Sequence, residues 1–143
     1  LLYLWQKRVL AGVSVYYPAP GSSDYEQCQR LNLLPEKTSL FRSSALPLDH
    51  LTSRLQTVTL LRMGRIVNFM KMLTAHGISI PAAESCSQAR LSLSLDRLDL
   101  GRKLLAWFLK DGHIRGVDAN GQVYPHAAAP ELVKKFLQNL REG

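Results

Sequence analysis

Hydrophobic residues in the middle of the chain recur at the three- and four-residue spacing of a helix face. One run of such positions covers residues 48–63, and a second covers residues 66–73. Gly64 lies between the two runs as a potential break, and Gly77 follows the second run as the expected C-cap. The pattern therefore predicts two consecutive helices joined near Gly64.

The second half of the chain carries three further helix-like patterns. Residues 84–95 form the weakest of them, because their first half is polar. Residues 98–109 show the clearest amphipathic stripe, which Gly112 closes. A final helix is predicted over residues 130–140, with proline at its first position, where proline is well tolerated.

Residues 1–47 differ from the rest of the chain in their density of helix breakers. Residues 1–10 are predicted to form a short helix or strand, and one short helix is predicted within residues 24–34. Because prolines and glycines interrupt every longer element, this region cannot build a core of its own. We therefore expect an extended arm over residues 1–47 that docks on partner proteins, followed by a helical domain over residues 48–143.

Two stretches of the chain follow one plan, the first ending at Gly77 and the second at Gly112. Each opens with an aliphatic residue before a proline, Pro47 or Pro81, and closes on its glycine. The prolines, and likewise the glycines, are about 34 residues apart, a period typical of helical repeat proteins.

At these residues the sequence resembles the pentatricopeptide-repeat family, whose units of about 35 residues are helical hairpins. The resemblance covers roughly half of the chain and is carried best by residues 75–81 and 97–112. It implies a mainly α fold, a short α-solenoid of stacked antiparallel helical hairpins behind the extended arm. It also implies Ser53 and Ser87 as base-reading positions on single-stranded RNA.

The charge of the chain favours a polyanionic partner. Lys and Arg number 18 against 11 for Asp and Glu, which gives a net charge of +7. Arginine, whose planar fork suits phosphate, predominates in the helical region. The predicted contacts to the RNA backbone are Arg54, Arg62, Arg65, Lys71, Arg90, Arg97, Arg102 and Lys103. The alternative is a solvated surface on which neighbouring aspartates pair with these cations.

Motifs for catalysis, cofactors and metals are missing from the sequence. No glycine-rich phosphate loop is present, and the four histidines are scattered along the chain. The two cysteines, Cys28 and Cys86, are too far apart for a metal-ligand pair. No apolar run reaches the length of about 18–20 residues that a membrane helix needs. We expect no enzyme activity, no cofactor, no metal and no membrane insertion.

These features lead to one functional hypothesis above the others. It is a non-catalytic, RNA-associated structural subunit of a large organellar ribonucleoprotein, with a mitochondrial ribosome in the organelle matrix as the favoured assembly. Its basic helices would contact the rRNA backbone, and its arm would contact neighbouring proteins. The chain begins at Leu1 and not at methionine, which would agree with removal of a targeting segment.

Two alternatives remain open. The first is a winged-helix nucleic-acid-binding module, with residues 78–80 as first strand and residues 96–111 as recognition helix. Residues 113–117 and 122–124 would then form the wing around the turn signal Asn120-Gly121. The second is an accessory subunit of a membrane-associated complex, whose basic face meets acidic protein or lipid.

Overall fold

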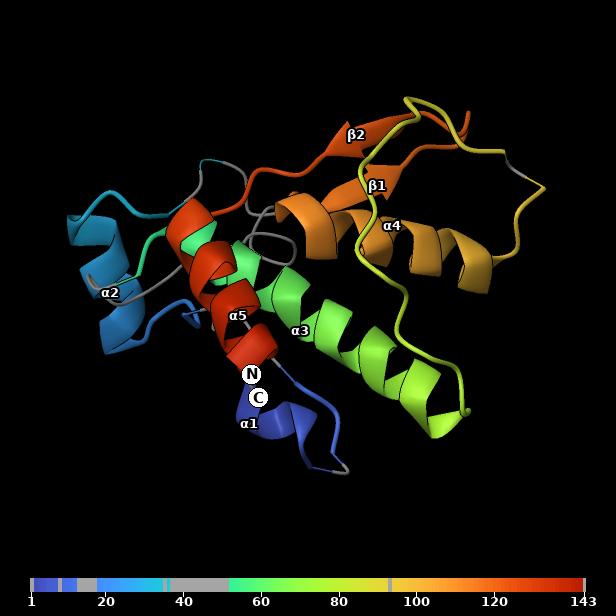
Figure 1. Cartoon of the computed structure of the whole chain (residues 1–143). Coiled ribbons are helices and arrows are strands. Elements are labelled where there is room, and N and C mark those ends of the chain that lie inside the picture. Colours follow the sequence, from blue (N-terminus) through green and yellow to red (C-terminus); the bar gives the residue numbers. More distant parts are fainter. Residues whose placement is uncertain are drawn as a thin grey trace.

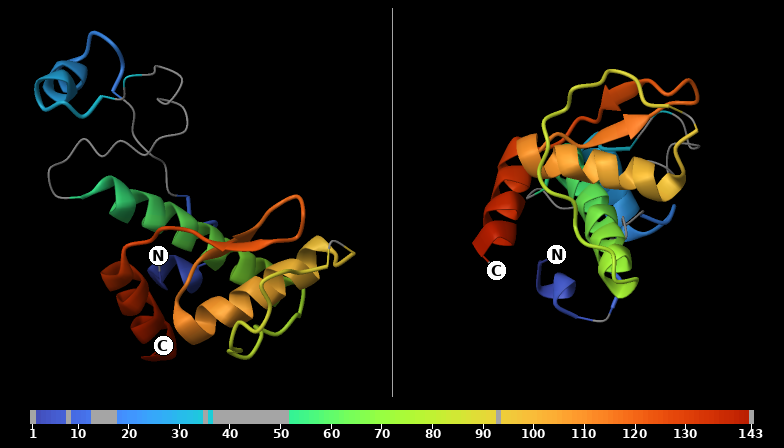
Figure 2. Two further views of the ribbon diagram at one scale, coloured as in Figure 1. Left: turned by 90° about the horizontal axis from the view of Figure 1, so that it is seen from above. Right: turned by 45° about the vertical axis from the view of Figure 1, so that its right-hand side comes forward.

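The computed structural model describes residues 2–7, 9–12, 18–34, 36, 52–92 and 94–142. In chain order, their elements are α1 (Leu2–Trp5), α2 (Ser23–Arg30), α3 (Arg54–Ala75), α4 (Arg97–Asp111), β1 (Arg115–Val117), β2 (Val123–Pro125) and α5 (Pro130–Glu142). Helices α3, α4 and α5 pack together, with the β1–β2 hairpin beside α4 and α1 near α3 and α5 (Figure 1). The short helix α2 stands apart from this body (Figure 2).

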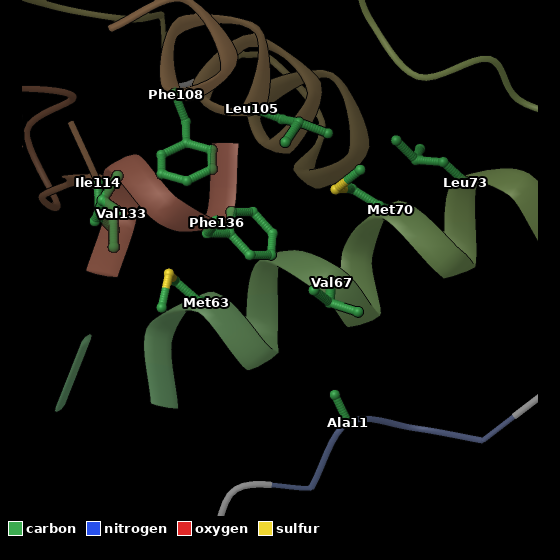
Figure 3. Packing of buried hydrophobic residues seen from close by; sticks show 10 residues of the cluster. All are labelled: Ala11, Met63, Val67, Met70, Leu73, Leu105, Phe108, Ile114, Val133 and Phe136. Carbon is green, nitrogen blue, oxygen red and sulfur yellow. The ribbon is translucent and has the colours of Figure 1, made fainter. Parts of the chain in front are cut away.

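The main core lies where α3, α4 and α5 meet. Helix α3 buries one residue in every three or four along the face that it turns toward the other two helices. Ile114, which follows α4, and Ala11 from the N-terminal segment complete the cluster (Figure 3). The buried residues are Ala11, Met63, Val67, Met70, Leu73, Leu105, Phe108, Ile114, Val133 and Phe136.

Helix α3 runs without interruption through Gly64, so the predicted break there is wrong. Ser53 begins the helix with a capping box, in which its hydroxyl accepts from the Gln56 amide and its own amide donates to the Gln56 side chain. A glycine inside a helix costs about 1 kcal/mol relative to alanine. Burial of Met63 and Val67 on the same face outweighs that cost, because the apolar stripe continues in phase across Gly64.

The predicted α-solenoid is also wrong. Residues 84–95 form no helix in their described part, and the first unit holds the single helix α3, so neither unit is a helical hairpin in the described residues. This segment is extended along α4, and the Glu84 amide donates to the carbonyl of Ala106 at 3.1 Å. Its polar half offers no apolar stripe that a helix could bury. The architecture is a helical body with a small antiparallel sheet.

The hairpin predicted from Asn120-Gly121 is confirmed. Strands β1 and β2 pair in antiparallel register, with Gly116 opposite Tyr124. The Asp118 carboxylate accepts hydrogen bonds from the amides of Asn120 and Gln122, and Gly121 adopts φ +80°. Local turn chemistry is therefore enough to fix this element.

A third extended piece joins the hairpin at β2. The Leu91 amide donates to the Gly121 carbonyl at 2.8 Å, and the Val123 amide donates to the Ala89 carbonyl at 2.9 Å. The winged-helix hypothesis placed the first strand at residues 78–80, which are not a strand in the structure. The pairing segment lies about ten residues later in the chain, as residues 89–91.

Helix α5 confirms the predicted C-terminal helix and closes the core. The rings of Phe108 and Phe136 pack at a centroid distance of 6.1 Å. At its start, the Ala129 amide donates to the buried Thr59 hydroxyl at 2.9 Å, which ties α5 to α3. A Cβ at Gly112 would lie 3.1 Å from Val133, so the end of α4 can approach α5 this closely because residue 112 is glycine.

The described start of the N-terminal arm lies on α3 of the same chain. The Asn68 carboxamide binds both backbone groups of Ala11, accepting from its amide at 2.7 Å and donating to its carbonyl at 3.1 Å. The Lys71 ammonium donates to the carbonyls of Lys7 and Val9. Helix α2 confirms the short helix predicted within residues 24–34. Docking of the arm on neighbouring proteins stays a prediction, and residues 37–51 lie outside the described residues.

Candidate nucleic-acid interface

The eight predicted RNA-contact residues do not form one surface. Arg54 and Arg97 are exposed at the N-terminal ends of α3 and α4, and Arg90 is exposed on the extended segment. Arg65 is exposed along α3 and lines a pocket at the crossing with α4. None of these four side chains forms an ion pair with a described carboxylate.

Two of the predicted cations donate hydrogen bonds to backbone carbonyls of the chain itself. The Arg62 guanidinium donates to the Ala127 carbonyl, and Lys71 holds the N-terminal segment. Burial, followed by the positive charge of Arg65, lowers the pKa of Arg62, which is consistent with positions three residues apart on one helix face. Both residues lie within the uninterrupted helix α3, which has no break at Gly64.

Arg102 and Lys103 lie half-buried on α4, beside the extended segment 79–84. The Nε atom of Arg102 is buried and has no hydrogen-bond partner among the described residues. Glu84 and Asp99 line the same pocket, so positive and negative side chains are mixed there. This mixture makes the pocket a poor match for a phosphate chain.

The two predicted base-reading serines do not share a helical register. The Ser53 hydroxyl is the N-cap acceptor of α3. Ser87 is exposed on the extended segment and lies on no helix. Because neither unit is a helical hairpin in the described residues, the register that the family resemblance implied for this pair has no structural counterpart.

A different group of cations comes together in a groove between the C-terminal end of α4 and α5, which lie side by side in Figure 1. Its volume is about 440 Å³. Lys110 comes from the last turn of α4, and Lys134 and Arg141 come from α5. Ile114, Val133 and Leu137 add apolar lining. We refer to this site as the α4–α5 groove.

Among the described residues, one carboxylate lines the α4–α5 groove, and its charge is already paired. Asp111 accepts two hydrogen bonds from the Arg115 guanidinium, at 2.6 and 2.9 Å, and one from the His113 amide. Burial acts to raise the pKa of Asp111, but these hydrogen bonds and the charge of Arg115 outweigh it and lower that pKa overall. The groove therefore keeps an excess of positive charge.

His126 contributes little to that charge at neutral pH. His126 lines the groove, and burial, followed by the nearby charge of Arg62, lowers its pKa. Its imidazole is therefore neutral at pH 7 and can act as donor or acceptor. Lys110, Lys134 and Arg141 remain the charged groups on which anion binding would depend, and no described carboxylate pairs with them.

Sequence reasoning missed Lys134 and Arg141 as interface residues. Their spacing of two helical turns, with Gln138 between them, places all three on one side of α5. That signal was readable in the sequence. That Lys110 lines the same groove could not be predicted from the sequence, because it depends on how α4 packs against α5.

Helix α4 is not free to act as a recognition helix. Leu105 and Phe108 are buried in the main core. Ala106 and Trp107 are buried outside that cluster, where the extended segment and the hairpin cover the helix. A helix that enters a DNA groove needs an open face, so the geometry does not favour groove docking through α4.

Comparison with known proteins adds no relative: no protein family, curated protein or solved structure matches the chain. In the described part of the chain, no helix is long and apolar enough to cross a membrane. The same residues contain no group of three or more His, Cys, Asp or Glu side chains arranged for a metal ion.

Proposed function

We propose that the protein is a non-catalytic, RNA-associated structural subunit of a ribonucleoprotein and that it contacts the RNA backbone through the α4–α5 groove. The observation that carries this proposal is the convergence of Lys110, Lys134 and Arg141 on one groove from two helices. Asp111, the one carboxylate that the described residues place there, is held by Arg115, so these three charges are available to an anion.

The chemistry of the groove favours phosphate recognition over base reading. Lysine acts as a point charge, and arginine can hold two phosphate oxygens at once. Contacts of this kind position a nucleic acid without reading its sequence, and they release condensed counterions. The apolar lining from Ile114 and Leu137 gives sugar groups a surface to contact.

Membership of a mitochondrial ribosome is a separate part of the proposal. This part is based on the sequence alone, and the proposed RNA contact in the α4–α5 groove does not depend on it. RNA backbone contact can therefore be tested first, on the purified chain.

The test is a titration of fluorescein-labelled RNAs of unrelated sequence at about 50 and about 200 mM salt. We expect similar affinity for every sequence, and a slope of log K against log salt near −2, from about 0.7 counterions per contacted phosphate on three contacts. The proposal would be contradicted by absence of binding at the lower salt concentration, or by an affinity that does not fall as salt is raised. Stronger binding to anionic lipid vesicles than to RNA would favour the membrane-associated alternative.

A further inference from the structure

Tyr124 is an exposed aromatic residue that the fold holds in place without burying it. It lies on β2, and 41% of its surface is exposed. Its partner across the hairpin is Gly116, and a Cβ at Gly116 would lie 2.7 Å from both the Cζ and the hydroxyl of Tyr124. The tyrosine ring therefore lies across the backbone of β1, in space that any larger residue at position 116 would fill.

His126 connects Tyr124 to the α4–α5 groove. The two rings are 5.1 Å apart and nearly perpendicular, with an interplanar angle of 76°. The His126 amide donates to the Ile114 carbonyl at 2.8 Å, which fixes the backbone after β2. Because His126 also lines the groove, its ring links Tyr124 to the site that Lys110, Lys134 and Arg141 line.

Tyr124 also lies in a basic setting. Arg62 is held by the Ala127 carbonyl, close enough for its charge to affect His126. Such a fixed guanidinium adds positive potential without needing to move when a ligand arrives. Aromatic rings beside a basic groove are the elements that bind single strands, because bases stack on the ring while the backbone follows the charge.

We propose that Tyr124 stacks on an unpaired base of single-stranded RNA whose phosphates lie in the α4–α5 groove. The inference rests on the proposed function and specifies its ligand. A duplex cannot bind in this way, because its base faces are already stacked inside the helix. Every base has a π-face, so no strong sequence preference is expected at this position.

The test compares Tyr124→Ala and Tyr124→Phe with the unchanged chain, on a labelled single strand of about 12 nucleotides and on its duplex. We expect Tyr124→Ala to weaken single-strand binding about tenfold and to leave duplex binding unchanged. Tyr124→Phe keeps the ring and should retain nearly all of the single-strand affinity. Urea unfolding of both variants confirms that the fold is intact.

The possible outcomes separate this inference from the proposed function. Equal binding of single strand and duplex, with no loss in Tyr124→Ala and a normal salt slope, would overturn the stacking role and leave the backbone contact standing. An equal loss of affinity for both RNA forms in Tyr124→Ala would also overturn it. Failure of the unchanged chain to bind either form would contradict the proposed function itself.

Discussion

Replacing Lys110, Lys134 and Arg141 together with alanine is expected to weaken RNA binding about 100-fold, at low salt, for all sequences alike. Each lost contact between a cation and a phosphate removes about 1 kcal/mol, and about 1.4 kcal/mol corresponds to tenfold in affinity. The three side chains are surface groups of the groove and form no described ion pair, so the fold should tolerate their removal. Fluorescence anisotropy at one fixed salt concentration measures the loss.

A matched control removes the same charge elsewhere. Arg54, Arg97 and Lys135 are exposed cations of α3, α4 and α5, and none of them lines the groove. Replacing these three with alanine changes the net charge by the same amount. Only the long-range electrostatic attraction to RNA is lowered, so the affinity should fall by less than about threefold. Equal losses in the two triple variants would mean that net charge, and not the α4–α5 groove, governs binding.

Trp107→Ala is expected to lower the free energy of unfolding by about 3–5 kcal/mol, as is typical when a large buried aromatic is removed. The side chain has no exposed surface and lies on the side of α4 that the hairpin and the extended segment cover. Its loss removes the contacts that hold the hairpin and the extended segment to α4. Urea unfolding followed by circular dichroism measures the change.

Trp107→Phe is the informative comparison at this position. The indole Nε1 is buried and has no hydrogen-bond partner among the described residues. Phenylalanine keeps most of the ring volume and carries no donor, so relief of the unpaired N–H offsets part of the lost packing. We expect a cost of about 1 kcal/mol or less. A loss as large as that of Trp107→Ala would show that the indole N–H does have a partner in solution.

The elements that local signals define could be predicted from the sequence. The hairpin follows from Asn120-Gly121, because the turn chemistry there does not depend on the rest of the fold. Helices α4 and α5 follow from strong apolar stripes bounded by Gly112 and Pro130. In each of these cases the local pattern and the tertiary packing favour the same conformation.

The prediction of an α-solenoid was wrong for the opposite reason. Prolines and glycines mark where elements begin and end, but they do not determine what lies between them. Residues 84–92 fit the period and yet are extended, because they pack on α4 and pair with β2. Glycine is typical of a helix break, but Gly64 lies inside α3. Burial of the neighbouring side chains stabilises the helical conformation there.

The positive charge of the candidate interface could be predicted from the sequence, but its location on the fold could not. The net charge indicated an anionic partner, whereas Arg62 and Lys71 turned out to bind backbone carbonyls from distant parts of the chain. The α4–α5 groove depends on the packing of two helices that lie about 20 residues apart in sequence, separated by the hairpin. No local spacing encodes that packing.

The most direct test of RNA contact in the α4–α5 groove is ultraviolet crosslinking of a photoactivatable single-stranded RNA to the full chain, with the crosslinked peptides mapped by mass spectrometry. We expect crosslinks on the residues that line the groove and on Tyr124 beside it; the lining residues include residues 110–114, Lys134, Leu137, Gln138 and Arg141. Crosslinks confined to the exposed ends of α3 and α4, around Arg54 and Arg97, with none in the groove, would contradict this expectation.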